Sequence, residues 1–137
     1  MAIFEELLEI AEHPFEIDLD SELDYVELLS NMVVGTAQSP LRVFECISKD
    51  MKCLGRISKR AGSEVSIYGF RLMPRGSTPL RRDWFDIRIE PRVSTPERAY
   101  YMDIVYRKPE ATLVLDFLKQ LHDKVGEIIL ALEEGGQ

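Results

Sequence analysis

The residues best suited to binding chemistry lie in one basic stretch of the chain, between positions 71 and 92. It holds the only tryptophan, Trp84, among six arginines, which are Arg71, Arg75, Arg81, Arg82, Arg88 and Arg92. A guanidinium group is a planar fork of donors that fits carboxylates and phosphates, and an aromatic ring beside it can stack on a base. The stretch therefore predicts a surface for an anionic ligand or partner, such as single-stranded RNA.

A second interpretation of this stretch is structural, and we favour it. Trp84 would then belong to the core, and the arginines would pair with acids such as Asp86 and Glu90. Arginines on solvated strands are common, and the aromatic pattern of RNA-binding sheets is missing. The binding surface is kept as an alternative.

Four residues of the expected strands support a weaker enzyme hypothesis. They are Asp83, Asp86, Arg88 and Asp103. To act as an acid–base set they would have to converge in a deep cleft with strongly shifted pKa values. The chain contains no H-E-x-x-H, G-x-S-x-G, G-x-G-x-x-G or G-x-x-x-x-G-K-[ST] pattern. We therefore expect no catalytic residue, no cofactor and a non-catalytic function.

The cysteines and histidines give weaker signals. Cys46 and Cys53 are not spaced as C-x-x-C, and no histidine lies near them in sequence, so the pattern does not support a zinc site. Each cysteine is interpreted as a small apolar residue on the flank of a helix. His13 is expected to end a first helix, and His122 to lie on the flank of the last one. We therefore expect no metal site.

Charge is divided unevenly along the chain. Residues 1–41 contain ten acids and no base, residues 42–108 contain fifteen bases and eight acids, and residues 109–137 contain two bases and six acids. We interpret the first block as an acidic arm that folds against the basic middle. The alternative is that the division marks a binding surface, which charge asymmetry by itself only suggests.

Composition places the chain among single-domain globular proteins. It has 137 residues with 45% hydrophobic and 30% charged side chains, enough to bury a core without metals or disulfides. No apolar run approaches the length of a transmembrane helix. Two cysteines and an acidic N-terminus predict a cytoplasmic protein, and the scarcity of Asn and Gln is a weak indication of a thermophilic source.

The apolar residues from Pro109 to Glu134 predict one long helix. Val114, Leu118, Leu121, Val125, Ile128 and Leu132 follow the a/d spacing of a heptad. This stripe is wider than one sheet face needs, so we expect a homodimer formed through the helix. The expected contact residues are Leu115, Leu118, His122, Val125, Gly126, Ile129 and Leu132. In the alternative, N-terminal helices cover the same flank within one monomer.

The first forty residues predict two helices and a strand. Apolar spacing indicates a helix over residues 3–11, and strict alternation indicates an edge strand over residues 15–19. Helical spacing resumes over residues 21–33. The segment 40–55 is ambiguous, because it fits a helix stopped by Gly55 or a hairpin that places Cys46 opposite Cys53. We favour the helix, since its polar positions repeat with the helical period.

Three strands are expected next, over residues 63–73, 83–93 and 99–107. Turn residues connect them, which favours an antiparallel meander of three to four strands. With N-terminal helices and one long C-terminal helix packed across the sheet, the chain is predicted to be a single α+β domain. We therefore expect a non-catalytic protein-binding or adaptor domain that self-associates through its C-terminal helix.

Overall fold

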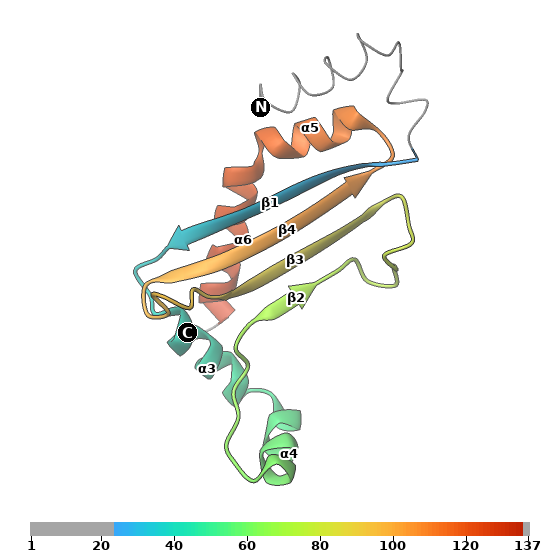
Figure 1. Cartoon of the computed structure of the whole chain (residues 1–137). Coiled ribbons are helices and arrows are strands. Elements are labelled where there is room, and N and C mark those ends of the chain that lie inside the picture. Colours follow the sequence, from blue (N-terminus) through green and yellow to red (C-terminus); the bar gives the residue numbers. More distant parts are fainter. Residues whose placement is uncertain (1–23, 136–137) are drawn as a thin grey trace, which may run out of the picture.

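A four-stranded sheet with helices on one face forms the described part of the protein, residues 24–135 of this computed structural model (Figure 1). The elements are β1 (Val26–Gly35), α3 (Pro40–Lys49), α4 (Lys52–Ala61), β2 (Phe70–Leu72), β3 (Trp84–Pro91), β4 (Ala99–Lys108), α5 (Ala111–Lys119) and α6 (Leu121–Gly135). The sheet is antiparallel and the chain ends on the long helix α6, so the predicted α+β class is confirmed. The helix predicted for residues 3–11 and the strand predicted for residues 15–19 lie outside the described residues.

β2, β3 and β4 form the predicted meander, and β1 pairs with the outer edge of β4. The spatial order is β1-β4-β3-β2, and each neighbouring pair is antiparallel. β1 pairs with β4 along its whole length, from Val26 opposite Lys108 to Gly35 opposite Ala99. α3 and α4 intervene in sequence between β1 and the meander, so they emerge at the end of the sheet where β1 stops (Figure 1).

The helix predicted for residues 21–33 is wrong, because this segment enters β1. The prediction rested on apolar residues spaced three and four apart, among them Leu29 and Val33. The same segment also alternates with period two: Val26 and Leu28 are buried, whereas Leu29 and Val33 are exposed on the other face. Ten paired residues stabilise the alternating arrangement, and this tertiary pairing outweighs the local helical spacing.

One face of the sheet holds the core. On the central strand β4, Tyr100, Met102 and Ile104 are at most 1% exposed and pack with residues of α6. α6 passes behind the sheet in Figure 1, and α5 lies beside β1. α3 closes one end through Phe44, which meets Phe70 and Tyr100 edge to face. Within residues 24–135, the opposite face of the sheet carries no helix (Figure 1).

The run predicted as one continuous helix over residues 109–134 forms two helices. α5 and α6 meet at Gln120, whose carbonyl accepts a hydrogen bond from the Lys124 amide (2.9 Å). α5 packs on an apolar cluster that contains Val26, whereas α6 packs on a separate cluster that contains Met102. One straight helix cannot face both clusters, so the break at Gln120 redirects the apolar stripe.

The segment 40–55 is helical, so the hairpin alternative is wrong, but the predicted single helix is divided. α3 begins after Ser39, whose Oγ accepts from the Arg42 amide (3.4 Å). α4 follows after a two-residue gap and contains Gly55, which was expected to end the helix. The stop is Gly62 instead, with φ 71°, a left-handed conformation that glycine adopts without strain.

Two serines anchor the return from α4 to the sheet. The strand predicted for residues 63–73 shortens to β2, because the backbone before β2 bonds to helix side chains. Ser48 Oγ accepts from the Ile67 amide (2.8 Å), and Ser58 Oγ accepts from the Val65 amide (3.1 Å). These bonds join the return segment to α3 and α4, so the two helices and the return form one projecting unit.

Gly69 fixes the approach of this return segment to β3. A Cβ at this position would lie 2.7 Å from the carbonyl oxygen of Ile89 and 3.0 Å from the Cβ of Glu90. Real side chains do not come so close to a backbone oxygen, so a larger residue would push the segment away from β3. The absence of a side chain therefore permits the register in which Phe70 opposes Ile89.

Replacing Ile129 with glutamate should unfold the monomer and not merely dissociate copies. Ile129 is 6% exposed in the core cluster of α6, and burying a charge there should lower the free energy of unfolding by at least about 3 kcal/mol. Urea denaturation measures this change. Leu130→Glu is the matched control, because Leu130 is 58% exposed and should change stability by about 0.5 kcal/mol or less. Equal effects of the two substitutions would contradict the placement of α6.

Candidate functional site

A buried arginine organises the corner of the sheet where β1 begins. The Arg107 guanidinium lies 4.4 Å from the ring centre of Tyr25 and 5.0 Å from that of Trp84. Its Nε donates to Glu27 Oε1 (2.6 Å), which lies directly across the strand pair. The aromatic faces and the carboxylate together compensate the charge that burial removes from water.

The same guanidinium holds the loop between β2 and β3. Its Nη1 donates to the carbonyl oxygens of Pro79 and Arg81 (2.9 Å for Arg81). The loop is held a second time at Arg82, whose Nε donates to the Asp24 carbonyl. Arg107 was not predicted as a site residue, although it is the only base of the strand predicted for residues 99–107.

The arginines predicted to bind an anion are spread over the open sheet face and its loops. On the face, Arg71 forms a two-pronged ion pair with Asp86 (Nη2–Oδ2 2.7 Å). This hydrogen bond, with the charge of Asp86, raises the pKa of Arg71. Arg88 is exposed, and in register it lies between Asp103 and Arg71. Arg71 is therefore already occupied by an acid of its own chain.

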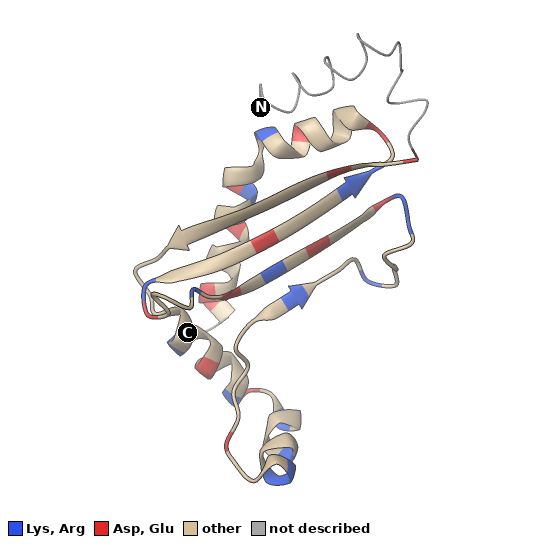
Figure 2. Ribbon diagram, viewed as in Figure 1, with Lys and Arg blue, Asp and Glu red and all other residues tan. Residues whose placement is uncertain are grey.

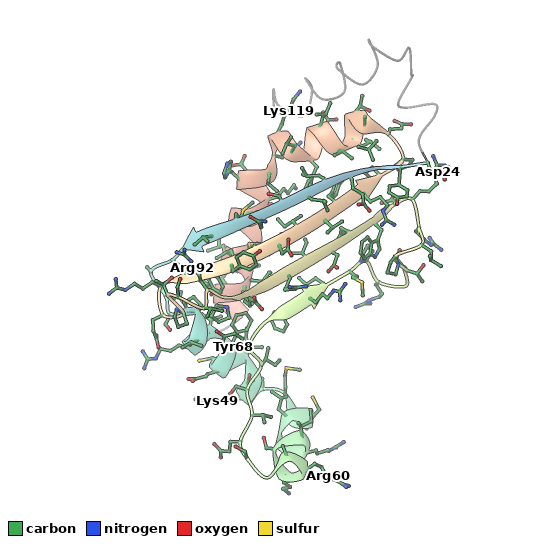
Figure 3. All side chains as sticks on the ribbon, viewed as in Figure 1. Asp24, Lys49, Arg60, Tyr68, Arg92 and Lys119 are labelled. Carbon is green, nitrogen blue, oxygen red and sulfur yellow. The ribbon has the colours of Figure 1, made fainter. Side chains whose placement is uncertain are left out.

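Trp84 is 6% exposed beneath Arg107, so it belongs to the interior, as the structural interpretation expected. Arg75, Arg81 and Arg82 are exposed on the loop that follows β2. Arg92 lies at the opposite end of the sheet from Asp24, and hence from the corner at which Arg82 bonds to Asp24 (Figure 3). The six arginines thus do not form one continuous surface with the tryptophan.

The residues named for the enzyme hypothesis lie on strands and at their ends. Asp83 pairs with Lys108 (2.6 Å), and this hydrogen bond is the main cause that raises the pKa of Lys108. Asp86 is engaged by Arg71, and Asp103 opposes Arg88. Asp83 and Asp86 are therefore each paired with a basic residue of the sheet. They form ion pairs on an open surface.

The densest group of unpaired bases lies elsewhere, on α4. Lys52, Arg56, Lys59 and Arg60 follow one side of this helix at positions i, i+4, i+7 and i+8. All four are exposed, and none forms an ion pair with another residue of 24–135. We call these four residues the basic stripe; Figure 2 shows the basic residues of α4, which projects away from the sheet on its β2 side. These four residues were not predicted as a site, although four bases in nine residues with no acid between them are a recognisable charge pattern.

The other side of α4 is apolar and only partly covered. No residue of α4 is buried; Leu54 and Ser58 are half-buried toward the return segment, whereas Ile57 is 49% exposed. Leu54 and Ser58 also line a cleft of about 900 Å³ between α4 and the return segment, with Lys52 and Lys59 at its wall. α4 therefore presents an exposed basic stripe beside an exposed apolar flank.

The residues predicted for self-association face the sheet more than the solvent. Val125 and Ile129 are buried in the core, and Leu118 and Leu132 pack against it. Leu115 is half-buried. His122 and Gly126 are exposed on α6.

The chain matches no protein-family model, no curated protein and no solved structure in the three comparisons made. Within residues 24–135, no group of three or more His, Cys, Asp or Glu side chains could hold a metal ion, and both cysteines are free. In the same part of the chain, no helix is long and apolar enough to cross a membrane.

Replacing Arg107 with methionine should release the loop between β2 and β3. The substitution keeps much of the apolar stem but leaves Glu27 and the Arg81 carbonyl without their donor, which should cost about 3 kcal/mol. Urea denaturation would measure the loss, and trypsin should cleave the loop faster. Arg88→Met is the control, because Arg88 is exposed. An unchanged cleavage rate in the Arg107 variant would contradict the anchoring role.

Proposed function

We propose that this protein is a non-catalytic protein-binding domain, and that its α3–α4 projection binds an acidic amphipathic segment of a partner protein. The observation that carries the proposal is the surface of α4. Its basic stripe forms no ion pair within residues 24–135, and its apolar flank is exposed beside the stripe. A helix that is amphipathic but unburied presents both features to a partner.

The apolar flank favours a protein partner over a nucleic acid. A phosphate backbone would engage the basic stripe through charge alone, and the affinity would fall steeply as salt rises. It would leave Ile57, 49% exposed, without an apolar contact. An acidic amphipathic helix offers carboxylates for the stripe and apolar side chains for the flank, so it removes both from solvent together.

The anchoring of the projection supports a binding role. Ser48 and Ser58 accept backbone hydrogen bonds from the return segment, so α4 is held on one side while its basic stripe stays exposed. A surface held in place before the partner arrives loses less conformational freedom on binding. The basic stripe and the apolar flank of α4 are therefore held in place before a partner binds.

Nucleic-acid binding by the arginine-rich stretch and self-association through the C-terminal helix remain predictions, and each is supported by a few exposed residues. Binding of single-stranded nucleic acid is supported by the exposed Arg75 and Arg81, which form no ion pair within residues 24–135. Self-association through the C-terminal helix would use the predicted contact residues that α6 leaves exposed, His122 and Gly126. Neither hypothesis uses the basic stripe, so each can be tested separately from the proposal.

A synthetic acidic amphipathic peptide should bind the full chain through α4. The probe is a short labelled helix with glutamates at i, i+4 and i+7 beside a leucine stripe, and fluorescence anisotropy follows its binding at dilute protein. The triple variant Lys52→Gln, Arg56→Gln, Lys59→Gln should weaken binding roughly tenfold, because it removes three surface ion pairs.

Controls separate this interaction from general charge attraction. Arg98→Gln, Lys119→Gln and Lys124→Gln remove the same net charge from parts of the chain outside α4 and should leave the affinity unchanged. A scrambled peptide of the same composition should bind more weakly, because it cannot place its acids and leucines on separate faces. Tighter binding of a single-stranded oligonucleotide than of the peptide, lost in the α4 variant, would overturn the proposal in favour of nucleic acid.

A further inference from the structure

We propose that the acidic segment bound by α4 is residues 3–12 of a second copy of this chain, so that two copies exchange their N-terminal segments. The inference rests on the proposed function, since it names the partner of the same surface. Four features support it: the distribution of charge, the spacing of the charged residues, the apolar residues beside them, and the length of chain available to reach α4.

The charge of the chain is separated between its N-terminal segment and its body. Residues 24–135 contain all seventeen bases and sixteen acids, whereas residues 1–23 contain eight acids and no base. The formal net charge of −7 therefore comes from the N-terminal segment. Within the body, α4 carries four bases and no acid. The strongest acidic segment and the most basic helix thus belong to the same chain.

The charged residues of the two segments have matching spacing. Glu5, Glu9 and Glu12 stand at i, i+4 and i+7 of the predicted N-terminal helix, with Glu6 beside them. The basic stripe repeats this spacing with Lys52, Arg56 and Lys59, and Arg60 stands beside them. Two helices packed side by side can therefore align three opposite charges along about two turns.

Apolar residues flank the charges in both segments. The predicted N-terminal helix carries a stripe of Ile3, Phe4, Leu7, Leu8 and Ala11. α4 leaves Ile57 exposed next to its basic stripe, and no residue of α4 is buried. Packing the two apolar flanks together would remove both from water while the charges pair at the rim.

The geometry favours exchange between copies over docking within one chain. Asp24, where the described chain begins, lies at the end of the sheet where β1 starts, and Arg60 lies at the tip of the projection, away from the sheet on its β2 side (Figure 3). β1 alone is about 33 Å long, and from its far end the chain passes through α3 before it reaches α4. The eleven residues from 13 to 23 reach at most about 40 Å when fully stretched, so a single chain would need an almost straight linker. A second copy carries no such constraint.

Exchange between two copies can be reciprocal. The N-terminal segment of each copy would bind α4 of the other, which gives the self-complementary interface of a twofold dimer. Both acidic segments and both basic stripes would then be satisfied in one closed assembly. This interface differs from the predicted one, because it uses α4 and not the C-terminal helix.

A charge-swap experiment on the full chain tests the exchange. One variant carries Lys52→Glu, Arg56→Glu and Lys59→Glu, and the other carries Glu5→Lys, Glu9→Lys and Glu12→Lys. Sedimentation velocity should find the wild type dimeric and each variant monomeric, because like charges then face each other. An equimolar mixture of the two variants should dimerise again, since each segment meets a stripe of opposite charge. Docking within one chain would predict monomers throughout.

Controls keep each outcome interpretable. Circular dichroism should show that both variants stay folded, as expected for residues that are exposed on α4; the milder Lys52→Gln, Arg56→Gln, Lys59→Gln variant replaces the reversal if it does not. A monomeric wild type, or a dimer that neither variant weakens, would overturn the exchange. If such a chain still binds the synthetic acidic peptide through α4, the proposed function stands and only the identity of the partner is wrong. If peptide binding is also absent, both fail.

Discussion

The sheet has a single apolar face, and the rest of the structure follows from the competition for that area. α6 covers the middle of the face over Met102, α5 covers the β1 side over Val26, and α3 inserts Phe44 at the end. Each of these helices buries at least one large apolar side chain. α4 has no buried apolar side chain. Packing on the sheet would therefore stabilise it little, and it lies outside the core. Its projection into solvent is thus a consequence of packing, and its exposed charges do not strain the core.

The opposite face is stabilised by a different set of forces. There the strands carry alternating acids and bases, which pair across strands as Arg71 does with Asp86. Exposed pairs of this kind contribute little stability. The exception is Arg107, whose guanidinium is enclosed by two aromatic rings, a carboxylate and loop carbonyls. One buried arginine therefore fixes the loop that carries the exposed Arg75 and Arg81, and these two form no ion pair within residues 24–135.

The sequence patterns predicted the elements that have only one plausible period. β3 and β4 alternate cleanly, and the structure places them within two residues of the predicted bounds. Residues 21–33 fit both periods, and pairing with β4, a contact distant in sequence, decided in favour of a strand. The break at Gln120 depends on where two apolar clusters lie on the sheet, which no local pattern encodes. The basic stripe was not predicted from the sequence. The arginine-rich stretch was predicted as a site because it contains the only tryptophan, yet Trp84 is buried, and the basic stripe contains no aromatic residue.

Gly69 has a consequence for the way this fold can diverge. Most positions of the core tolerate exchange among apolar residues of similar volume, so their identities can drift until two descendants share little recognisable sequence. Position 69 has no such freedom, because even a methyl group would collide with the Ile89 carbonyl. Descendants that retain the short strand β2 must therefore retain a glycine just before it. In a distant lineage, a lone glycine ahead of a three-residue strand, followed by two long alternating strands, would be a more durable mark of common ancestry than overall identity.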